Sequence, residues 1–339
     1  MKLVKYNSGR LGALMDDGSV IDLNYAFAAY KKSKGNQRPY AKADAKVPSC
    51  LLAFIKEGKN GLEAAQKAID YVKAGNKKGP KGEKLHLKAE KAKLFAPLPS
   101  DATRIAMAGA NFYDHSADAA KAMSGNVVTI DELKERVANN DYPPWGFWKM
   151  AKNVIGPGGE TPYPDRTKRL DYEVEVGAVL GKSGKDIPEE EAMSYVYGYT
   201  IVNDLSCRDG PRTRGPNGLF YAKNFDGCAP MGPCIVTADE IGDPHKLKMK
   251  QWVNGELRQD GTMESIIRPF SWWINYLTRD MTFYTGDIIC GGTCSGTAMD
   301  QTQRIDGKTS PDLFLKPGTQ LKAWIEKIGA LETKIVPKE

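Results

Sequence analysis

One short segment, residues 170–182, constrains the fold more than any other part of the chain. It reads LDYEVEVGAVLGK, in which the valines alternate with other residues as in a β-strand. Because successive side chains of a strand point to opposite faces, Glu173 and Glu175 share one face with Asp171. Tyr172 lies on the other face. Like charges on one strand face repel, and burying them is costly unless positive charge compensates them. The segment therefore predicts either a bound cation or a solvated strand face.

A third carboxylate, Asp204, follows the apolar run YTIV (199–202) near the end of the next expected strand. A side chain in this place can turn into a cleft. Three hard oxygen ligands favour Mg²⁺, Mn²⁺ or Ca²⁺ over zinc, which prefers nitrogen and sulfur. The chain has three histidines, too few for a histidine-rich zinc site. From the residues alone, a metal site formed by Glu173, Glu175 and Asp204 and an ordinary solvated strand face stay equally open.

Two domains are expected from a chain of 339 residues. Residues 1–95 carry 20 Lys and Arg against 9 Asp and Glu, whereas the whole chain has a net charge of +6. Strand patterns in 1–24 and a helical pattern in 62–75 indicate a small basic α+β domain. From residue 96 to 339 strands separated by Gly- and Pro-rich turns dominate. The predicted fold class is therefore α+β and strand-dominated, with domains 1–95 and 96–339.

The basic first domain raises the alternative of a nucleic-acid partner. Its lysines are scattered, without interleaved aromatic residues or a recognisable binding motif, so a solvated lysine-rich surface is the favoured interpretation. No apolar run approaches the roughly 18 to 20 residues that span a bilayer, and the first residues lack an apolar secretion signal. The six cysteines show no paired zinc spacing and are expected to be reduced. We expect a cytoplasmic protein with no nucleic-acid or membrane partner.

Seven motifs follow one another between about residues 104 and 300: GANFYDH (109–115), FWKMAKNVIGPG (147–158), DYEVEVGAVLGK (171–182), GYTIVNDLSCRD (198–209), KNFDGCAPMGPCIVT (223–237), VNGELRQDG (253–261) and TGDIICGGTCSGTA (285–298). Together they resemble the fumarylacetoacetate hydrolase family. The resemblance implies a mixed β-roll in the larger domain, usually as a homodimer, and a lid segment at about 115–160 that closes over substrate. It also implies Glu173, Glu175 and Asp204 as ligands of a divalent ion, which favours the metal site over the solvated face.

The same resemblance implies roles for further side chains. His115, at the start of the lid, corresponds to a histidine that activates water as a general base. Asp118, three positions later on a helix, would orient this histidine. Lys223 would hold the substrate carboxylate or a developing oxyanion. Thr293 lies in a glycine-rich turn suited to an anionic oxygen. Apart from the resemblance, Arg208 and Arg212 lie close to this site in the sequence and are candidates to bind a second substrate carboxylate, with a flexible loop as the alternative for Arg212.

With these residues, the resemblance implies a divalent-metal-dependent hydrolase that acts in aromatic or amino-acid catabolism. Water activated by His115 would attack the distal carbonyl of a 2,4-dioxo acid of the acylpyruvate or fumarylacetoacetate type and break a C–C bond. Mg²⁺ or Mn²⁺ is the expected ion, with Ca²⁺ as a further option, and the partner is a small anionic 2-oxo acid. A structural ion pair is the alternative role of Arg208.

Two other functions stay open at this point. The nearest alternative is decarboxylation or keto–enol isomerisation of a 2-oxo dioate at the same metal site. A non-catalytic binding protein, with the basic N-terminal domain contacting nucleic acid, belongs to a different class. The complete set of histidine, lysine and three carboxylates disfavours this second reading.

Overall fold

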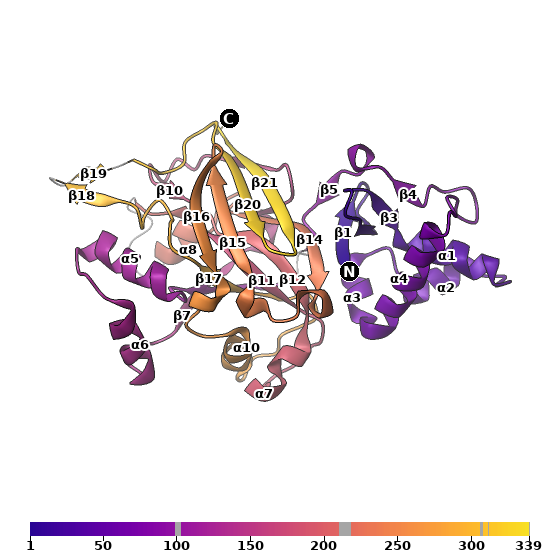
Figure 1. The fold of residues 1–339 in the computed structure, drawn as a ribbon, viewed down its shortest axis with the longest axis horizontal. Coiled ribbons are helices and arrows are strands. Elements are labelled where there is room, and N and C mark those ends of the chain that lie inside the picture. Colours follow the sequence, from indigo (N-terminus) through magenta and orange to yellow (C-terminus); the bar gives the residue numbers. More distant parts are fainter. Residues whose placement is uncertain (99–102, 210–217, 306–307, 311, 339) are drawn as a thin grey trace.

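The computed structural model describes residues 1–98, 103–209, 218–305, 308–310 and 312–338. Figure 1 shows a large strand-rich body with a smaller N-terminal lobe, coloured indigo to purple, beside it. The fold is mixed α+β and rich in strands, which confirms the predicted class. Among the helices described, none is long and apolar enough to cross a membrane.

The N-terminal lobe combines short strands with a group of helices. The helix α4 covers most of the segment 62–75 for which the sequence predicts a helix, and it begins one turn earlier. The elements of the lobe are β1 (Lys2–Tyr6), β2 (Arg10–Leu14), β3 (Val20–Asp22), α1 (Leu23–Ser33), α2 (Pro39–Lys46), α3 (Leu51–Lys56), α4 (Gly58–Lys73), β4 (His86–Leu87), η1 (Ala89–Lys91) and β5 (Leu94–Phe95).

The larger body follows. Its first half contains β6 (Ile105–Gly109), α5 (Tyr113–Ser124), α6 (Ile130–Ala138), β7 (Trp145–Lys149), η2 (Ala151–Asn153), β8 (Val154–Ile155), β9 (Glu160–Pro162), β10 (Leu170–Asp171), β11 (Val174–Leu180), α7 (Glu189–Ala192), η3 (Met193–Tyr195), β12 (Val196–Asn203) and β13 (Ser206–Cys207). Its second half contains α8 (Gly218–Lys223), β14 (Ala229–Thr237), α9 (Ala238–Ile241), η5 (Pro244–Lys246), β15 (Lys248–Val253), β16 (Glu256–Thr262), η6 (Met263–Ser265), α10 (Phe270–Thr278), β17 (Ile288–Thr293), β18 (Gln303–Ile305), β19 (Lys308–Ser310), β20 (Gln320–Ile325) and β21 (Gly329–Val336).

One mixed sheet joins the lobe to the body. Its strands lie in the order β4-β3-β2-β1-β14-β12-β11-β17-β6-β7, with β5 beside β1 and β8 beside β14. The junction is the antiparallel pair β1–β14, in which Leu3 lies opposite Ile235. Residues 1–95 therefore share their sheet with the larger part of the chain. The domain boundary near residue 95 stays a prediction.

The strand β11 is buried on both faces. Val174 and Val176 belong to a core cluster with Met249 of β15, which lies in a second sheet of order β16-β15-β20-β21-β9. Val179 belongs to another cluster that includes Phe54 of the N-terminal lobe. Because neighbouring side chains of β11 alternate between these two cores, polar residues at its start are buried as well.

The predicted strand over 170–182 is interrupted. The two parts, β10 and β11, are separated by Tyr172 and Glu173. Facing them, β12 and β13 are separated at Asp204, whose N–H donates to the carbonyl oxygen of Glu173 at 2.7 Å. Asn203, opposite Val174 in the register, accepts from the Glu173 N–H at 3.1 Å. The paired interruptions place Glu173 and Asp204 next to each other.

The segment expected as a lid contains α5, α6, β7 and β8. A capping box between Thr129 and Glu132 fixes the start of α6. The strand β7 pairs antiparallel with β6 at the end of the large sheet. The segment therefore begins in α5, just after β6, and returns to the sheet as β7, which lies next to β6.

One carboxylate stabilises the start of the N-terminal lobe. The buried side chain of Asp22 caps α1 by accepting from the Tyr25 N–H at 2.8 Å. It also accepts from the hydroxyl of Tyr6 at 2.5 Å and from Nε of Arg10 at 2.6 Å. The same carboxylate thus satisfies a helix terminus, a buried hydroxyl and a guanidinium.

Replacing Asp22 by alanine removes the helix cap and leaves Arg10 without its carboxylate. We expect Asp22→Ala to lower the free energy of unfolding by about 3 kcal/mol, measured by urea unfolding with circular dichroism. Asp16→Ala is the control, because the exposed Asp16 carboxylate forms only a surface ion pair with Lys2, at 3.8 Å. The urea midpoint of this variant should equal that of the wild-type protein. Equal midpoints for the two variants would contradict the prediction.

Candidate metal and active site

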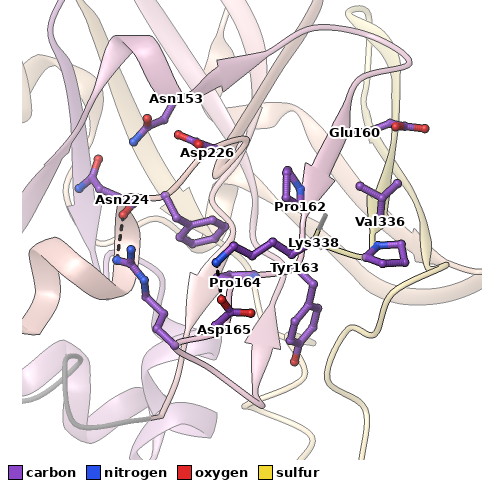
Figure 2. Close-up of a pocket in the computed structure, with 13 residues that line it drawn as sticks. Asn153, Glu160, Pro162, Tyr163, Pro164, Asp165, Asn224, Asp226, Val336 and Lys338 are labelled. Atoms are coloured by element: carbon purple, nitrogen blue, oxygen red, sulfur yellow. Dashed lines mark hydrogen bonds and ion pairs between the residues drawn. The ribbon is translucent and has the colours of Figure 1, made fainter.

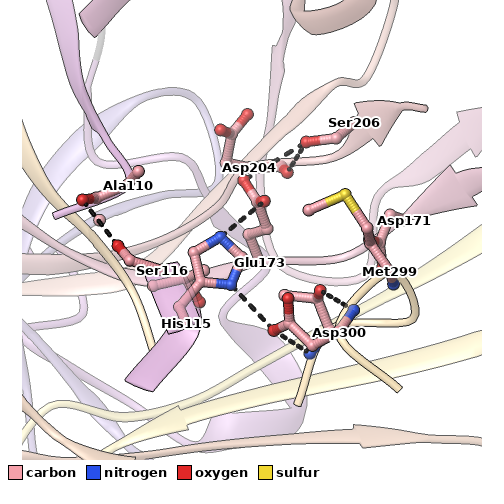
Figure 3. Close-up of polar contacts among 12 residues, drawn as sticks. Ala110, His115, Ser116, Asp171, Glu173, Asp204, Ser206, Met299 and Asp300 are labelled. Carbon is pink, nitrogen blue, oxygen red and sulfur yellow. Dashed lines mark hydrogen bonds and ion pairs between the residues drawn. The ribbon is translucent and has the colours of Figure 1, made fainter. Parts of the chain in front are cut away.

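The three carboxylates that the sequence singles out lie together. One oxygen each of Glu173, Glu175 and Asp204 lies within 4.8 Å of the others, and all three side chains are buried. Glu173 precedes β11, Glu175 is in β11 and Asp204 follows β12, so the antiparallel pairing of these strands brings them together. Figure 3 shows Glu173 and Asp204 beside each other. The structure thus forms the cluster that the segment 170–182 predicts.

Three basic side chains surround these carboxylates. Lys223, at the end of α8, donates to Glu173 Oε2 at 2.7 Å and to Asp204 Oδ2 at 2.6 Å. Lys149, at the end of β7, lies 2.7 Å from Asp204 Oδ1. Arg208 forms an ion pair with Glu173. Sequence reasoning did not single out Lys149. The available signal was its position in a strand, where it shares a face with Trp145 and Phe147.

Glu175 is the carboxylate that these cations compensate least. Among the described residues, the hydrogen bond to its side chain comes from the Gly292 N–H at 2.9 Å. Burial raises the pKa of Glu175 well above its usual value, and Asp204 and Glu173 raise it further. Burial acts in the same direction on Glu173, but neighbouring cations, Arg208 first, hold the pKa of Glu173 well below its usual value. Positive charge is therefore deficient around Glu175.

The donor set fits a divalent cation. Within the described residues, this network contains five carboxylates and three permanent cations. Burial and the neighbouring carboxylates raise the pKa of Glu175, which a bound cation would relieve, and carboxylate oxygens are the ligands that Mg²⁺ and Mn²⁺ prefer. The five carboxylates are those of Asp171, Glu173, Glu175, Asp204 and Asp300.

His115, in the first turn of α5, faces this cluster (Figure 3). Its Nε2 lies 4.0 Å from Glu173 Oε1, and its Nδ1 lies 2.8 Å from Asp300 Oδ2. Burial tends to lower the pKa of His115, but Asp300 and Glu173 outweigh burial and raise the pKa above its usual value. Because Asp300 engages Nδ1, Nε2 is the nitrogen that remains for proton transfer with a bound molecule.

The expected partner of His115 has to be corrected. Asp118 accepts a hydrogen bond from the Ser295 hydroxyl, and Asp300 contacts the imidazole in its place. Asp300 comes from the loop after β17, where two backbone N–H groups hold its Oδ2 at 3.1 Å. Sequence reasoning missed Asp300 because it lies 185 positions from His115. An acidic residue shortly after the GGTCSG motif was the only local signal.

The other expected substrate-binding residues differ in their surroundings. The Thr293 hydroxyl donates to the carbonyl oxygen of Val174 and accepts from Gln259 Nε2, both at 2.8 Å, so neighbouring protein groups already engage it. Arg208 is held in ion pairs, as its structural alternative predicts. Arg212 lies outside the described residues.

A cavity of about 440 Å³ opens onto this cluster. His115, Lys223 and the three carboxylates form its polar part. Trp145 and Phe147 of β7 and Ala119 of α5 provide apolar walls from the lid segment. The volume lies within the range of small-molecule sites, which usually combine apolar walls with a few convergent polar groups.

A larger cavity, of about 1390 Å³, lies beside the end of β21 (Figure 2). Several of its charged side chains are engaged with neighbours: Arg166 donates to backbone carbonyls, and Lys338 pairs with Asp165. Over the part of the chain that the structure describes, the group of potential metal ligands lies at the smaller cavity. Chemistry rather than size therefore marks the smaller cavity as the candidate site.

Comparison with known proteins decides the family. The family described as Fumarylacetoacetate (FAA) hydrolase C-terminal matches residues 104–336. The chain belongs to the fumarylacetoacetate hydrolase family. This is the family that the seven motifs resemble, and the matched range contains all three carboxylates, His115 and Lys223.

Other family members are similar over nearly the whole chain. Oxaloacetate tautomerase YisK from Bacillus subtilis (strain 168) is 31% identical over 331 residues, 97% of each chain. The mitochondrial oxaloacetate tautomerase fahd2 from Xenopus laevis is 29% identical over 342 residues, 99% of this chain and 90% of that protein. A fumarylacetoacetate hydrolase from psychrophilic Exiguobacterium antarcticum has a similar structure, with a TM-score of 0.70, 25% identity and 100% coverage of both chains. The similarity therefore includes the N-terminal lobe.

Replacing Glu175 by glutamine tests the metal site. The amide keeps the shape of the side chain but removes a ligand charge, so we expect the dissociation constant for Mn²⁺ to rise at least about tenfold. Titration calorimetry on metal-stripped protein measures this constant. Without metal, the melting temperature should not fall, because Glu175 lacks a charged partner at hydrogen-bond distance among the described residues. Glu190→Gln, an exposed substitution, is the control, and unchanged Mn²⁺ affinity in Glu175→Gln would exclude Glu175 as a ligand.

Replacing Asp300 by asparagine tests the partner of His115. Asp300 raises the pKa of His115, so its neutralisation should lower that pKa in the metal-free protein. NMR titration of the imidazole measures the change, and His115→Ala identifies the signal among the three histidines. Asp118→Asn is the matched control and should have the smaller effect. A larger shift with Asp118→Asn would restore the partner that the sequence predicts.

Proposed function

We propose that this protein is a divalent-metal-dependent tautomerase that interconverts the keto and enol forms of a small 2-oxo dioate such as oxaloacetate. The observation that carries the proposal is a single buried histidine, His115, which faces the carboxylate cluster across the cavity. The similarity to oxaloacetate tautomerases over 97% and 99% of the chain supports this reaction over others in the family.

The residues of the site account for the proton transfer. A divalent ion held by Glu173, Glu175 and Asp204 would supply Lewis-acid stabilisation of negative charge on the 2-oxo oxygen. His115 Nε2 takes a proton from C3 of the keto form, while Asp300 holds Nδ1 and fixes the ring. The electrons of that C–H bond form the C2–C3 double bond, and the electrons of the C2–O π bond move to the oxygen. The proton that His115 took from C3 then passes to this oxygen, which completes the enol and regenerates the base. Atoms balance without water or a co-substrate.

Positive charge at the cavity suits an anionic substrate. Lys223, Arg208 and Arg169 line the cavity together with the carboxylates. Lys223 is the cation that contacts two of the proposed ligands, so it lies where a substrate carboxylate next to the metal would approach. We therefore propose a small anionic 2-oxo acid as the partner of the site, with Lys223 as the cation that its carboxylate would meet.

The His115–Asp300 pair also favours a second function, hydrolysis of a C–C bond in a 2,4-dioxo acid. An imidazole whose Nδ1 is held by a carboxylate is arranged to activate water at Nε2. The similar structure from Exiguobacterium antarcticum is named a fumarylacetoacetate hydrolase. The two functions differ in the atom that lies against Nε2, which is C3 of the substrate in one and a water molecule in the other.

A turnover screen of metal-stripped protein, with and without added Mg²⁺ or Mn²⁺, separates these functions. We expect metal-dependent conversion of enol to keto oxaloacetate, followed by ultraviolet absorbance, without release of CO₂. His115→Ala should lower this rate by about 10² to 10⁴-fold while its melting temperature still rises with added Mn²⁺. Acetylpyruvate, fumarylpyruvate and fumarylacetoacetate, analysed by mass, test hydrolysis in the same preparation.

Three results would contradict the proposal. Cleavage of a dioxo acid together with no effect on oxaloacetate would establish the hydrolase instead. Release of CO₂ from oxaloacetate as the main reaction would establish a decarboxylase. Normal tautomerisation by His115→Ala would remove His115 from the role of base, whichever substrate is used.

A further inference from the structure

The backbone just before His115 adopts an unusual conformation. Ala110, between β6 and α5, has φ of 45°, in the left-handed region that residues with a side chain rarely adopt. Such a conformation persists where the surrounding structure holds it in place. Ala110 is followed within five positions by His115, so whatever fixes Ala110 also fixes the first turn of α5.

Two hydroxyls hold this position. The hydroxyl of Tyr142 lies 3.0 Å from the carbonyl oxygen of Ala110 and 3.0 Å from Ser116 Oγ. Ser116 Oγ itself donates to the Ala110 carbonyl oxygen at 3.0 Å, a contact visible in Figure 3. Ser116 is the neighbour of His115 in the first turn of α5, and its side chain is buried. The two hydroxyls and the carbonyl form a closed triangle behind the imidazole.

Tyr142 comes from the far end of the lid segment. It lies between α6 and β7, 26 positions from Ser116. Its ring is flanked by two guanidinium groups, Arg136 at 5.6 Å and Arg268 at 5.9 Å from the ring centroid. Arg268 also donates to the carbonyl oxygen of Tyr142. These contacts fix the position of Tyr142, and its hydroxyl contacts the turn at Ala110.

Arg268, which contacts Tyr142, is also hydrogen-bonded to the turn at Ala110 through Asn111. Asn111, next to Ala110, donates from Nδ2 to the carbonyl oxygens of Arg268 and Gly291, at 3.0 and 2.9 Å. Its Oδ1 accepts from the Arg268 N–H at 3.0 Å. Arg268 thus contacts both Tyr142 and Asn111, so the lid end, the turn and the strand β17 form one hydrogen-bonded unit.

We propose that Tyr142 is a positioning residue that couples the far end of the lid segment to His115. It acts through Ala110 and Ser116 and does not belong to the residues that line the cavity. The inference rests on the proposed function, because it takes His115 as the catalytic base. With the hydroxyl in place, the first turn of α5 has one orientation, and Nε2 of His115 faces Glu173; without it, the turn at Ala110 loses part of its support.

Tyr142→Phe removes the hydroxyl and keeps the ring between its two arginines. We expect kcat to fall about tenfold to a hundredfold with KM within about twofold, since a small displacement of a catalytic group affects the reaction more than binding. Mn²⁺ affinity and melting temperature should stay close to wild type. Ser116→Ala, which removes the second hydroxyl, should lower kcat in the same way.

Tyr284→Phe is the matched control. Tyr284 is exposed, an arginine (Arg104) lies 5.4 Å from its ring centroid, and no hydrogen bond of its hydroxyl is found among the described residues. Its kcat should equal that of wild type. Loss of kcat in Tyr284→Phe equal to that in Tyr142→Phe would show a general effect of removing a tyrosine hydroxyl and would overturn the proposal.

A double-mutant cycle separates positioning from structure. If Tyr142 acts through His115, Tyr142→Phe should have no further effect on the residual rate of His115→Ala. Additive losses would overturn the proposal. The proposed function and the coupling can be contradicted separately. Normal turnover by His115→Ala contradicts the role of His115 as the base. Loss of turnover in His115→Ala together with a normal kcat in Tyr142→Phe contradicts only the coupling.

A measurement without substrate gives a second readout. The ring resonances of His115 in Tyr142→Phe, recorded by NMR on metal-free protein, should differ from wild type, while those of His86 and His245 should not. Tyr284→Phe should leave all three unchanged. Unaltered His115 resonances in Tyr142→Phe would overturn the proposal even if no substrate is turned over.

Discussion

The repulsion between three buried carboxylates governs how the centre of this molecule is built. Burying an ion costs several kcal/mol unless an opposite charge and hydrogen bonds compensate it. Three separate elements each contribute one cation to the cluster: β7 carries Lys149, α8 carries Lys223, and the chain just after β13 carries Arg208. The position of these elements around β11 is therefore coupled to the charge of the site.

The carboxylates themselves could be predicted because their signals are local. The period of two in a strand places Glu173 and Glu175 on one face, and the family motifs point to Asp204. The break between β10 and β11 could not be predicted, because alternation continues through it. That break matters, since it lets the backbone of Glu173 accept from the Asp204 N–H and brings the two side chains together.

Lys149 and Asp300 could not be predicted, because their partners lie far away in the sequence. Helical spacing suggests a contact between His115 and Asp118, yet the Asp118 carboxylate instead accepts a hydrogen bond from the Ser295 hydroxyl. Asp300, from the loop after β17, contacts His115 instead. Two backbone N–H groups of that loop donate to its carboxylate. The same limit applies to the N-terminal lobe: the change in charge near residue 95 is visible in the sequence, but the pairing of β1 with β14 is not.

The two proposed reactions place the same demands on the carboxylates and differ in what must lie beside Nε2 of His115. Proton transfer at C3 and activation of water both use an imidazole held at Nδ1, so the carboxylates and the His115–Asp300 pair suit either. Hydrolysis requires space for a water molecule beside Nε2, whereas tautomerisation requires the substrate carbon to fill that space. Trp145 and Phe147 of β7 and Ala119 of α5 line this cavity, and Tyr142 joins the far end of the same segment to the turn before His115. Under the two proposed functions, a difference in these cavity walls would change which atom meets Nε2 of His115, while the three carboxylates stay the same.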